Sequence, residues 1–523
     1  MKHSSLLLGA ATLPLAAALT LCGCASPSTF SQPETATPSD WSQWRTGDAA
    51  LPRPVTTTAS ASTATATATA APAAGHGAGW WTTLNDPVLD ELEGRAARAS
   101  PDLRTAALHF AQARTQLQVA ISQRGPQAKA SAGALRQRQS EYGASTRLLD
   151  VIGGSSGANR DQLVSALSSP FNDYQAGLDV SWELDLWGRV SQSIEAADAD
   201  VATQVALLAL ARQSLAGQVA QHYLALRSAQ DQRQVVEEDV AGQQDRLDLL
   251  KARVDAGLID HFDLERQRAD LATTRAQLPA LLDQLAQAQG QLELLLGEQP
   301  GALSAVLAPR RSTAGATALP DLSLGLPSEV ARRRPDIRAA EAKLRKAVAN
   351  VGIAQAELYP SIRIGAHAGL ESYQAGKFTD WASRTWSIGP SLDLPIFDRG
   401  RRQRVVQLRE LQQQEAAIDY QQTVVKSWHE IDDALNTYVS EREQLTEARQ
   451  REAHLQDALD LVSARYGAGT VDVGSVLDVR RGLLQARRER VLSEGRLRQK
   501  YVQLHRATAA EVAVGDASDE LPD

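Results

Sequence analysis

The chain has 523 residues, of which 62 are acidic and 54 are lysine or arginine, so its formal net charge is −8. This balance lacks the basic footprint of a nucleic-acid-binding protein, and we expect no nucleic-acid partner. Two cysteines cannot build a disulfide framework or a four-thiolate metal site. The only long apolar run, Leu6–Leu21, is too short to supply the spans of an inner-membrane transporter.

The N-terminus has the layout of a bacterial export signal. A short positive region, Met1-Lys2-His3, precedes the apolar run, and Leu21-Cys22-Gly23-Cys24 resembles a lipobox. We therefore expect a signal peptide over residues 1–23 and acylation of Cys24, palmitate included, which would give stable membrane attachment. Ala25 stands where an inner-membrane retention aspartate would be, which predicts the outer membrane. The alternative is an ordinary signal peptide with incidental cysteines.

The segment after the lipobox is rich in Ser, Thr, Pro and Ala and ends in a Thr-Ala alternation over 63–70. Such a composition cannot bury a hydrophobic core. We therefore predict a flexible, lipid-anchored linker over residues 24–79, with order beginning near Trp80.

The remainder of the sequence is duplicated. Pro101-Asp102-Leu103-Arg104 recurs 234 residues later as Pro335-Asp336-Ile337-Arg338, and Gly188-Arg189 recurs 212 residues later as Gly400-Arg401. The two offsets differ because the first copy has a longer loop between about Leu135 and Pro170. We expect a first repeat over 80–300, a connector over 301–324, a second repeat over 325–511 and an acidic, disordered tail over 512–523.

Four segments alternate between apolar and polar side chains, two in each repeat, over about 126–138, 172–186, 360–372 and 383–396. In the second segment, for example, Leu178, Val180 and Trp182 share one face. A period of two predicts half-buried strands. About ten tilted residues are enough to cross the hydrocarbon core of a bilayer.

Long segments without proline follow these strands, over residues 188–254 and 400–466. Their apolar side chains recur every three or four positions and their other face is polar, which is typical of coiled coils in water. Each segment would form roughly 100 Å of helix. Shorter helices are expected over 102–124, 260–296, 336–359 and 472–508.

Four strands from one chain cannot close a barrel, because open sheet edges in lipid leave backbone groups unpaired at several kcal/mol each. Closed membrane barrels begin near eight strands. If the strands cross a membrane, several copies of the chain must combine. A soluble sheet packed on helices is the alternative that the strand pattern leaves open.

Several motifs support a specific resemblance: Gly325-Leu326-Pro327-Ser328, the block RRRPDIRAAE over 332–341, Leu394-Pro395-Ile396-Phe397-Asp398, and Arg465-Tyr466-Gly467-Ala468-Gly469. Together with the lipobox and the duplication, they resemble the outer membrane factors, the TolC-like exit ducts. The chain is most similar to their OprM/NodT-type lipoprotein branch, over roughly residues 80–511.

The resemblance implies a mainly α-helical fold with a membrane β-barrel, in which each chain carries two helix-strand-strand-long helix-helix repeats. It also implies a homotrimer: a twelve-stranded outer-membrane barrel continuing into a periplasmic tunnel of twelve helices with coiled coils. The implied partners are a periplasmic adaptor (membrane fusion) protein, an inner-membrane pump of the RND or a similar type, and outer-membrane lipid.

The family closes its tunnel where the long helices turn back, which here means the turns at Gly257 with Asp260 and at Gly469 with Asp472. The resemblance assigns five residues to the aperture or gate: Asp263, Tyr466, Gly474, Ser475 and Asp478. Of these, Tyr466 and Asp263 would form a latch, and three copies of Asp478 would form an acidic ring that binds cations. Val471 stands where a latch arginine would be, so that salt bridge is not expected.

No catalytic constellation is recognisable, since the sequence has no His-Glu-x-x-His, no phosphate loop and no Gly-x-Ser-x-Gly elbow. His261 and Glu265 are four residues apart, a spacing more typical of a solvated helix face than of a metal site. We expect no enzymatic activity, no cofactor and no metal.

The predicted function is a passive conduit that carries small molecules, such as drugs in multidrug resistance, from the pump and adaptor to the exterior. Opening would require an adaptor that binds the open and closed tips unequally. One alternative keeps the duct for protein or polysaccharide secretion. Another is a structural coiled-coil lipoprotein without a channel, which predicts no amphipathic strands.

Overall fold

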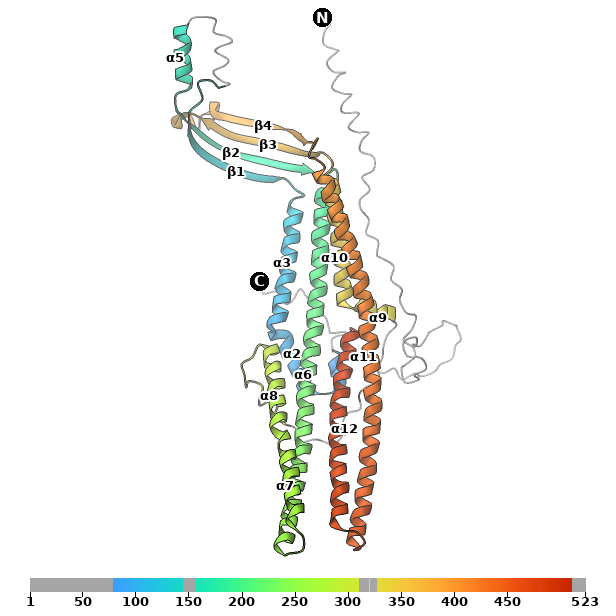
Figure 1. Ribbon diagram of the computed structural model, residues 1–523. Helices are drawn as coiled ribbons and strands as arrows, with labels where there is room; N and C mark the ends of the chain where they lie inside the picture. The colour runs from blue at the N-terminus through green and yellow to red at the C-terminus, as the bar shows by residue number, and fades with distance from the viewer. Residues whose placement is uncertain (1–78, 144–156, 310–318, 320–326, 510–523) are drawn as a thin grey trace, which may run out of the picture. The chain divides into compact units, whose positions relative to one another are not determined.

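The computed structural model describes residues 79–143, 157–309, 319 and 327–509 (Figure 1). The expected signal peptide, Cys24, the linker up to residue 78, the acidic tail and most of the connector lie outside the described residues. The described chain forms two compact units. One comprises Ala113–Val201 and Lys343–Ala416, and the other comprises the described residues of 79–112, 202–342 and 417–509.

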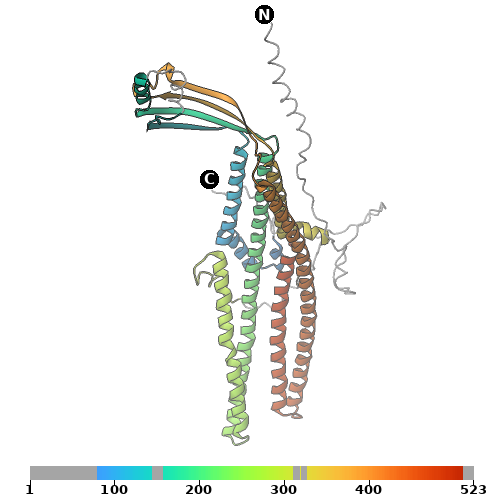
Figure 2. The ribbon, with the colours of Figure 1, turned by 45° about the horizontal axis from the view of Figure 1, so that its top comes forward.

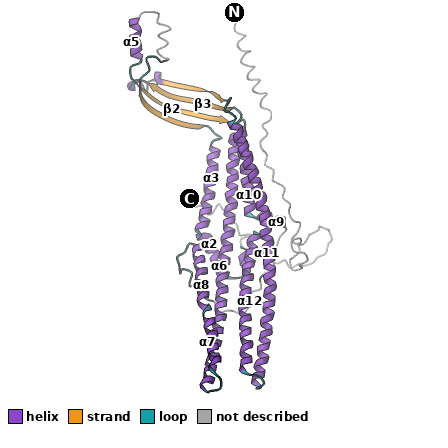
Figure 3. Cartoon of the chain, viewed as in Figure 1, coloured by secondary structure: helices purple, strands orange, loops and turns teal. Residues whose placement is uncertain are grey.

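Helices and strands follow the same order in both repeats (Figure 3). The first repeat contains η2 (Trp80–Leu84), α2 (Pro87–Ala99), α3 (Pro101–Ser122), β1 (Gln127–Gln137), α5 (Gly157–Leu167), β2 (Phe171–Leu184), α6 (Arg189–Asp255), α7 (His261–Arg275) and α8 (Gln277–Leu296). The second contains α9 (Pro327–Arg333), α10 (Pro335–Ala356), β3 (Ser361–Ser372), η3 (Ala375–Lys377), η4 (Trp381–Ser383), β4 (Arg384–Asp393), α11 (Arg401–Gly467) and α12 (Val473–Ala507). The long helices α6 and α11 each have 67 residues.

No helix in the described part of the chain combines the length and the apolar character needed to cross a membrane.

The four strands form one antiparallel sheet in the order β1-β2-β3-β4, and they stay side by side when the view is turned (Figure 2). The register confirms the alternation read from the sequence. One cross-strand row joins the apolar residues Ala130, Leu178, Ala368 and Trp386, and the next row joins Lys129, Asp179, His367 and Ser387. In the described chain β1 pairs only with β2, and β4 pairs only with β3.

A left-handed glycine and an aspartate start each long helix. Gly188 and Gly400 have φ values of 77° and 76°, a backbone conformation that is strained for residues with a Cβ atom. Asp185 accepts hydrogen bonds from the backbone nitrogens of Val190 and Ser191 at 2.8 and 2.7 Å. Asp398 accepts from Gly400 and Arg402 at 3.0 and 3.2 Å. These carboxylates satisfy N–H groups that have no partner inside the helix.

The expected single helix over 260–296 is wrong, because the structure divides it into α7 and α8 at Ala276. Pro279 lies three residues after the break. It has no N–H to donate to the carbonyl of Arg275, and its ring crowds that carbonyl. The longer loop of the first repeat is also not wholly irregular, since it contains α5, which lies at the end of the sheet remote from the start of α6 (Figure 1).

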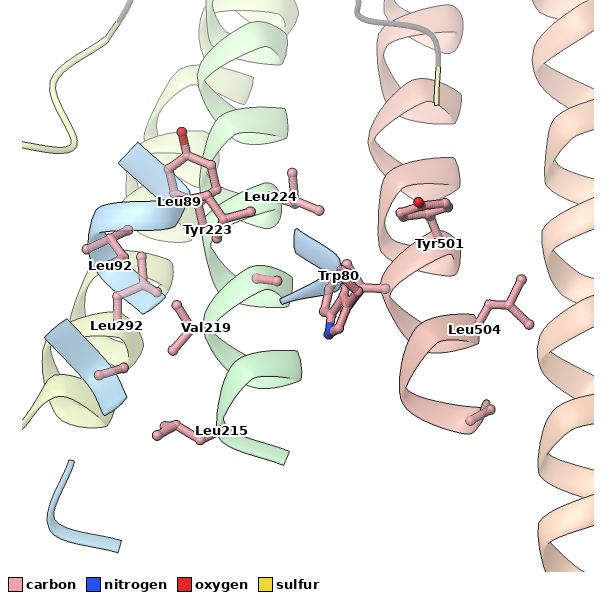
Figure 4. Packing of buried hydrophobic residues seen from close by; sticks show 14 of the residues in the cluster. Trp80, Leu89, Leu92, Leu215, Val219, Tyr223, Leu224, Leu292, Tyr501 and Leu504 are labelled. Carbon is pink, nitrogen blue, oxygen red and sulfur yellow. The ribbon is translucent and has the colours of Figure 1, made fainter. Parts of the chain in front are cut away.

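The hydrophobic core of the second unit joins α2, α6, α8 and α12 to the first described residues. Leu89, Leu92, Val219, Tyr223 and Leu292 are fully buried in it. Figure 4 shows Trp80 between α6 and α12, where its indole stacks on His505 with ring centroids 5.0 Å apart. An aromatic contact therefore joins the first described residues to the last described helix.

Candidate functional site

Both long helices end in the same kind of turn. After α6, Leu258 N donates to Arg253 O and Gly257 N donates to Val254 O, each at 2.9 Å. After α11, Thr470 N donates to Arg465 O at 3.0 Å and Gly469 N to Tyr466 O at 2.9 Å. This is the Schellman arrangement, which requires a left-handed residue. Gly257 and Gly469 supply it with φ values of 70° and 72°.

An aspartate then caps the returning helix in each turn. Asp260 accepts a hydrogen bond from Phe262 N at 2.8 Å. Asp472 accepts from Ser475 N at 2.9 Å and from Ser475 Oγ at 2.8 Å. These hydrogen bonds, and the positive charge of Arg253 at the end of α6, lower the pKa of the Asp472 carboxyl. These turns close two helical hairpins, the first formed by α6 with α7 and α8 and the second by α11 with α12.

The predicted gate residues lie on or beside these turns. Tyr466 is on the last turn of α11, Asp263 is on the first turn of α7, and Gly474 and Ser475 are on the first turn of α12. The side chains of Tyr466 and Asp263 are exposed, and in the described chain no hydrogen bond joins them. One chain alone therefore does not form the predicted latch.

Asp478 is exposed on the second turn of α12, and its charge interacts with Arg246 of α6. Burial lowers the pKa of the Arg246 guanidinium on α6, and the charge of Arg481 lowers it further. Asp478 and Asp270 act in the opposite direction on Arg246. The carboxylate at the predicted aperture is thus electrostatically coupled to a half-buried arginine of the other hairpin.

Ion pairs that sequence reasoning missed join α12 to the first hairpin. Arg481 contacts Asp270 of α7 at 2.7 Å. Arg488 contacts Asp239 of α6 and donates to Gln277 of α8 at 3.1 Å. Arg481 and Arg488 are seven residues apart, so they share one helix face. That spacing is a sequence signal, but the carboxylate partners, more than 200 residues away, could not be read from it.

The two hairpins are held together by different chemistry. Between α11 and α12, Glu452 pairs with both Arg487 and Arg490, and Glu441 pairs with Arg496 at 2.9 Å. Between α6 and α7, Gln243 donates to Thr274 at 2.8 Å and Arg275 donates to Gln244 at 2.8 Å. The second hairpin is therefore bound by ionic contacts and the first mainly by amide and hydroxyl hydrogen bonds.

The described residues hold no group of three or more His, Cys, Asp or Glu side chains placed to bind a metal ion. His261 and Glu265, the pair with four-residue spacing, are both exposed on α7. Glu265 forms an ion pair with Arg268 at 2.6 Å.

Comparison with known proteins identifies the class to which this architecture belongs. The outer membrane efflux protein family matches residues 92–298 and 326–510, and the chain belongs to this family. It is an outer-membrane lipoprotein and the exit channel of a tripartite efflux system, a transport protein and not an enzyme.

Individual relatives agree with this assignment. The chain is 29% identical over 413 residues to the cation efflux system protein CusC of Escherichia coli, covering 78% of this chain and 84% of CusC. It is 30% identical over 421 residues to the toluene efflux pump outer membrane protein TtgF of Pseudomonas putida, covering 78% and 80%. Among solved structures, the outer-membrane channel OprN superposes with a TM-score of 0.77 at 26% identity, covering 93% of this chain and 99% of OprN.

Proposed function

We propose that three copies of the chain form one duct, a twelve-stranded outer-membrane barrel that continues into a periplasmic tunnel of twelve helices. The observation that carries this proposal is the open sheet: β1 and β4 each have one unpaired edge in the described chain. Unpaired backbone groups are not tolerated in lipid, so each edge needs the edge of a neighbouring copy. Three sheets of four strands exceed the minimum for closure.

The two faces of the sheet suit a wall between lipid and water. On β4, Trp386, Ile388 and Leu392 are all exposed on the apolar face. On the other face, His367 Nδ1 lies 2.7 Å from Asp179 Oδ1, and Glu183 pairs with Arg189 at 2.7 Å. An apolar face against lipid and a polar face toward a water-filled lumen is the pattern of membrane barrels. The strands also argue against a structural coiled-coil lipoprotein without a channel.

The long helices also offer contacts to neighbouring copies. Leu411, Ile418 and Val425 of α11 are seven residues apart, and each is more than half exposed in the single chain. Apolar side chains at this spacing form one face of a coiled coil. In the trimer this face would pack against a helix of the next copy.

The gate is proposed at the two hairpin turns. Three copies of Asp478 would form an acidic ring, with Gly474 and Ser475 beside it, and Tyr466 and Asp263 would form a latch. The turns at Gly257, Asp260, Gly469 and Asp472 would keep these groups in place. A periplasmic adaptor and an inner-membrane pump, RND or similar, would open the gate and supply small molecules such as drugs or toxic compounds.

Cys24 is proposed to anchor each copy to the membrane after removal of residues 1–23, with the segment 24–79 as a flexible linker. The remaining proposed divisions are the repeats over 80–300 and 325–511, the connector 301–324 and the tail 512–523.

The test is the mass and conductance of the purified full-length lipoprotein in detergent. Light scattering is expected to give three copies in one particle, and the same sample should form ion-conducting channels in planar bilayers. A single-copy particle without conductance would overturn the proposal.

A further inference from the structure

Two adjacent apolar side chains at the junction between β4 and α11 are almost fully exposed. The relative exposure of Ile396 is 89% and that of Phe397 is 84%. Side chains of this size gain substantially from leaving water, so exposure of both indicates that something covers them in the working protein. Both residues lie in the compact unit that contains the sheet.

Other exposed apolar groups come from neighbouring segments of this unit. Leu394 precedes the pair, and Leu186 occupies the junction between β2 and α6 in the first repeat. Tyr359, three residues after the end of α10, is exposed although its ring stacks on Trp187 with centroids 4.8 Å apart. Exposed apolar side chains thus occur at both strand-to-helix junctions.

The next residues along the chain are basic. Arg399, Arg401 and Arg404 are exposed, and none of them forms an ion pair with a carboxylate in the described chain. The nearby acidic group, Asp398, is occupied, since it caps α11 and pairs with Arg402 at 3.7 Å. Glu357 also contributes its backbone carbonyl to Arg402. The surface therefore presents apolar side chains next to uncompensated positive charge.

We propose that this junction, Ile396 and Phe397 with Arg399, Arg401 and Arg404, is a docking surface for anionic phospholipid of the periplasmic leaflet. The inference rests on the proposed duct, in which the sheet crosses the outer membrane and the strand-to-helix junctions lie at its inner face. The apolar pair inserts among acyl chains and the guanidinium groups bind headgroup phosphates. Apolar insertion combined with basic charge is the chemistry of interfacial lipid anchors.

The apolar half of the surface is tested with a nitroxide at Phe397→Cys in the full-length protein, reconstituted in vesicles of equal parts phosphatidylcholine and phosphatidylglycerol. Ser463→Cys, exposed near the other end of α11, is the matched control. We expect collisions with oxygen to be several-fold more frequent, and collisions with a water-soluble nickel chelate several-fold rarer, at residue 397. The unsubstituted protein, treated with the same nitroxide reagent, gives the background signal of the label.

Two results at residue 397 would overturn the proposal. Shielding from both reagents would mean that another copy of the chain covers the site, and free access of the nickel chelate would mean that water does. Particle mass and channel conductance are measured on the same samples. Loss of these would instead count against the trimeric duct.

The basic half is tested by the preference of the protein for spin-labelled phosphatidylglycerol over spin-labelled phosphatidylcholine. In the triple variant Arg399→Gln, Arg401→Gln and Arg404→Gln, this preference is expected to fall by at least half. The control variant Lys251→Gln with Arg465→Gln removes charge at the hairpin tips and should leave it unchanged. An unchanged preference in the triple variant would disprove the headgroup contacts.

Discussion

Arg488 of α12 contacts Asp239 of α6, whose relative exposure is only 2%. The contact joins helices from different repeats, and Gln277 of α8 adds a hydrogen bond to the same guanidinium. A carboxylate this deeply buried is tolerated because a charge of opposite sign lies against it. The pair therefore ties α12 to the first hairpin.

Removing the arginine should be costly. In Arg488→Leu the carboxylate of Asp239 would stay buried without its counter-charge, keeping only the hydrogen bond from Gln243. We expect a loss of roughly 3 kcal/mol in the free energy of unfolding. Urea unfolding followed by circular dichroism measures this. The control is Glu489→Gln. Glu489 lies on the same helix as Arg488 and pairs at the surface with Arg451 of α11. Its replacement should cost less than about 1 kcal/mol. Equal effects in the two variants would contradict the special role of the buried pair.

Neutralising the proposed ring should change ion selectivity. In Asp478→Asn the aperture would lose three negative charges, so the reversal potential in a potassium chloride gradient should shift toward weaker cation preference. Asp457→Asn, an exposed carboxylate of α11, serves as the control and should leave the reversal potential unchanged. If both variants behave like the parent channel, Asp478 does not line the aperture.

Loosening the proposed latch should raise conductance. Replacing Tyr466 or Asp263 by alanine would remove a contact made only in the closed tip, so channels in planar bilayers should open more readily. Leu461 is exposed on α11 five residues before Tyr466. The control Leu461→Ala tests whether shortening any side chain in this region raises the conductance. Unchanged conductance in both latch variants would remove the assignment.

Acid should weaken the aromatic contact that holds Trp80. Burial lowers the pKa of His505 to about 4, below its ordinary value of 6.5, so the folded chain favours the neutral ring. As the pH falls, His505 therefore binds a proton in the unfolded chain before it does so in the folded chain. Its contribution to the free energy of unfolding is complete above pH 6.5 and is lost as the pH drops toward 4. At pH 5 the loss from this group is about 2 kcal/mol.

The measurement is urea unfolding of the parent protein and of His505→Phe at pH 7 and pH 5. Phenylalanine keeps the aromatic packing on Trp80 but cannot bind a proton. The parent should therefore lose more stability than the variant between the two pH values. The same loss in both proteins would show that other groups cause the acid sensitivity.

Local pattern alone determined the four strands, the two long helices and the turns that follow those helices. Alternation with period two placed the strands within a few residues of Gln127–Gln137, Phe171–Leu184, Ser361–Ser372 and Arg384–Asp393. Proline-free periodicity placed α6 and α11, and the repeated Gly-Asp pairs placed the turns. The break at Ala276 was also encoded locally, by Pro279, although the periodicity of the surrounding residues concealed it.

Only the tertiary structure decided which distant residues meet. Arg488 pairs with Asp239, Arg481 pairs with Asp270, and His505 stacks on Trp80. The local sequence around each residue does not predict its partner. Periodicity specifies which face of a helix is apolar or charged, but not which helix that face will touch. Such pairings depend on how whole helices pack, and that is a property of the folded chain rather than of any segment.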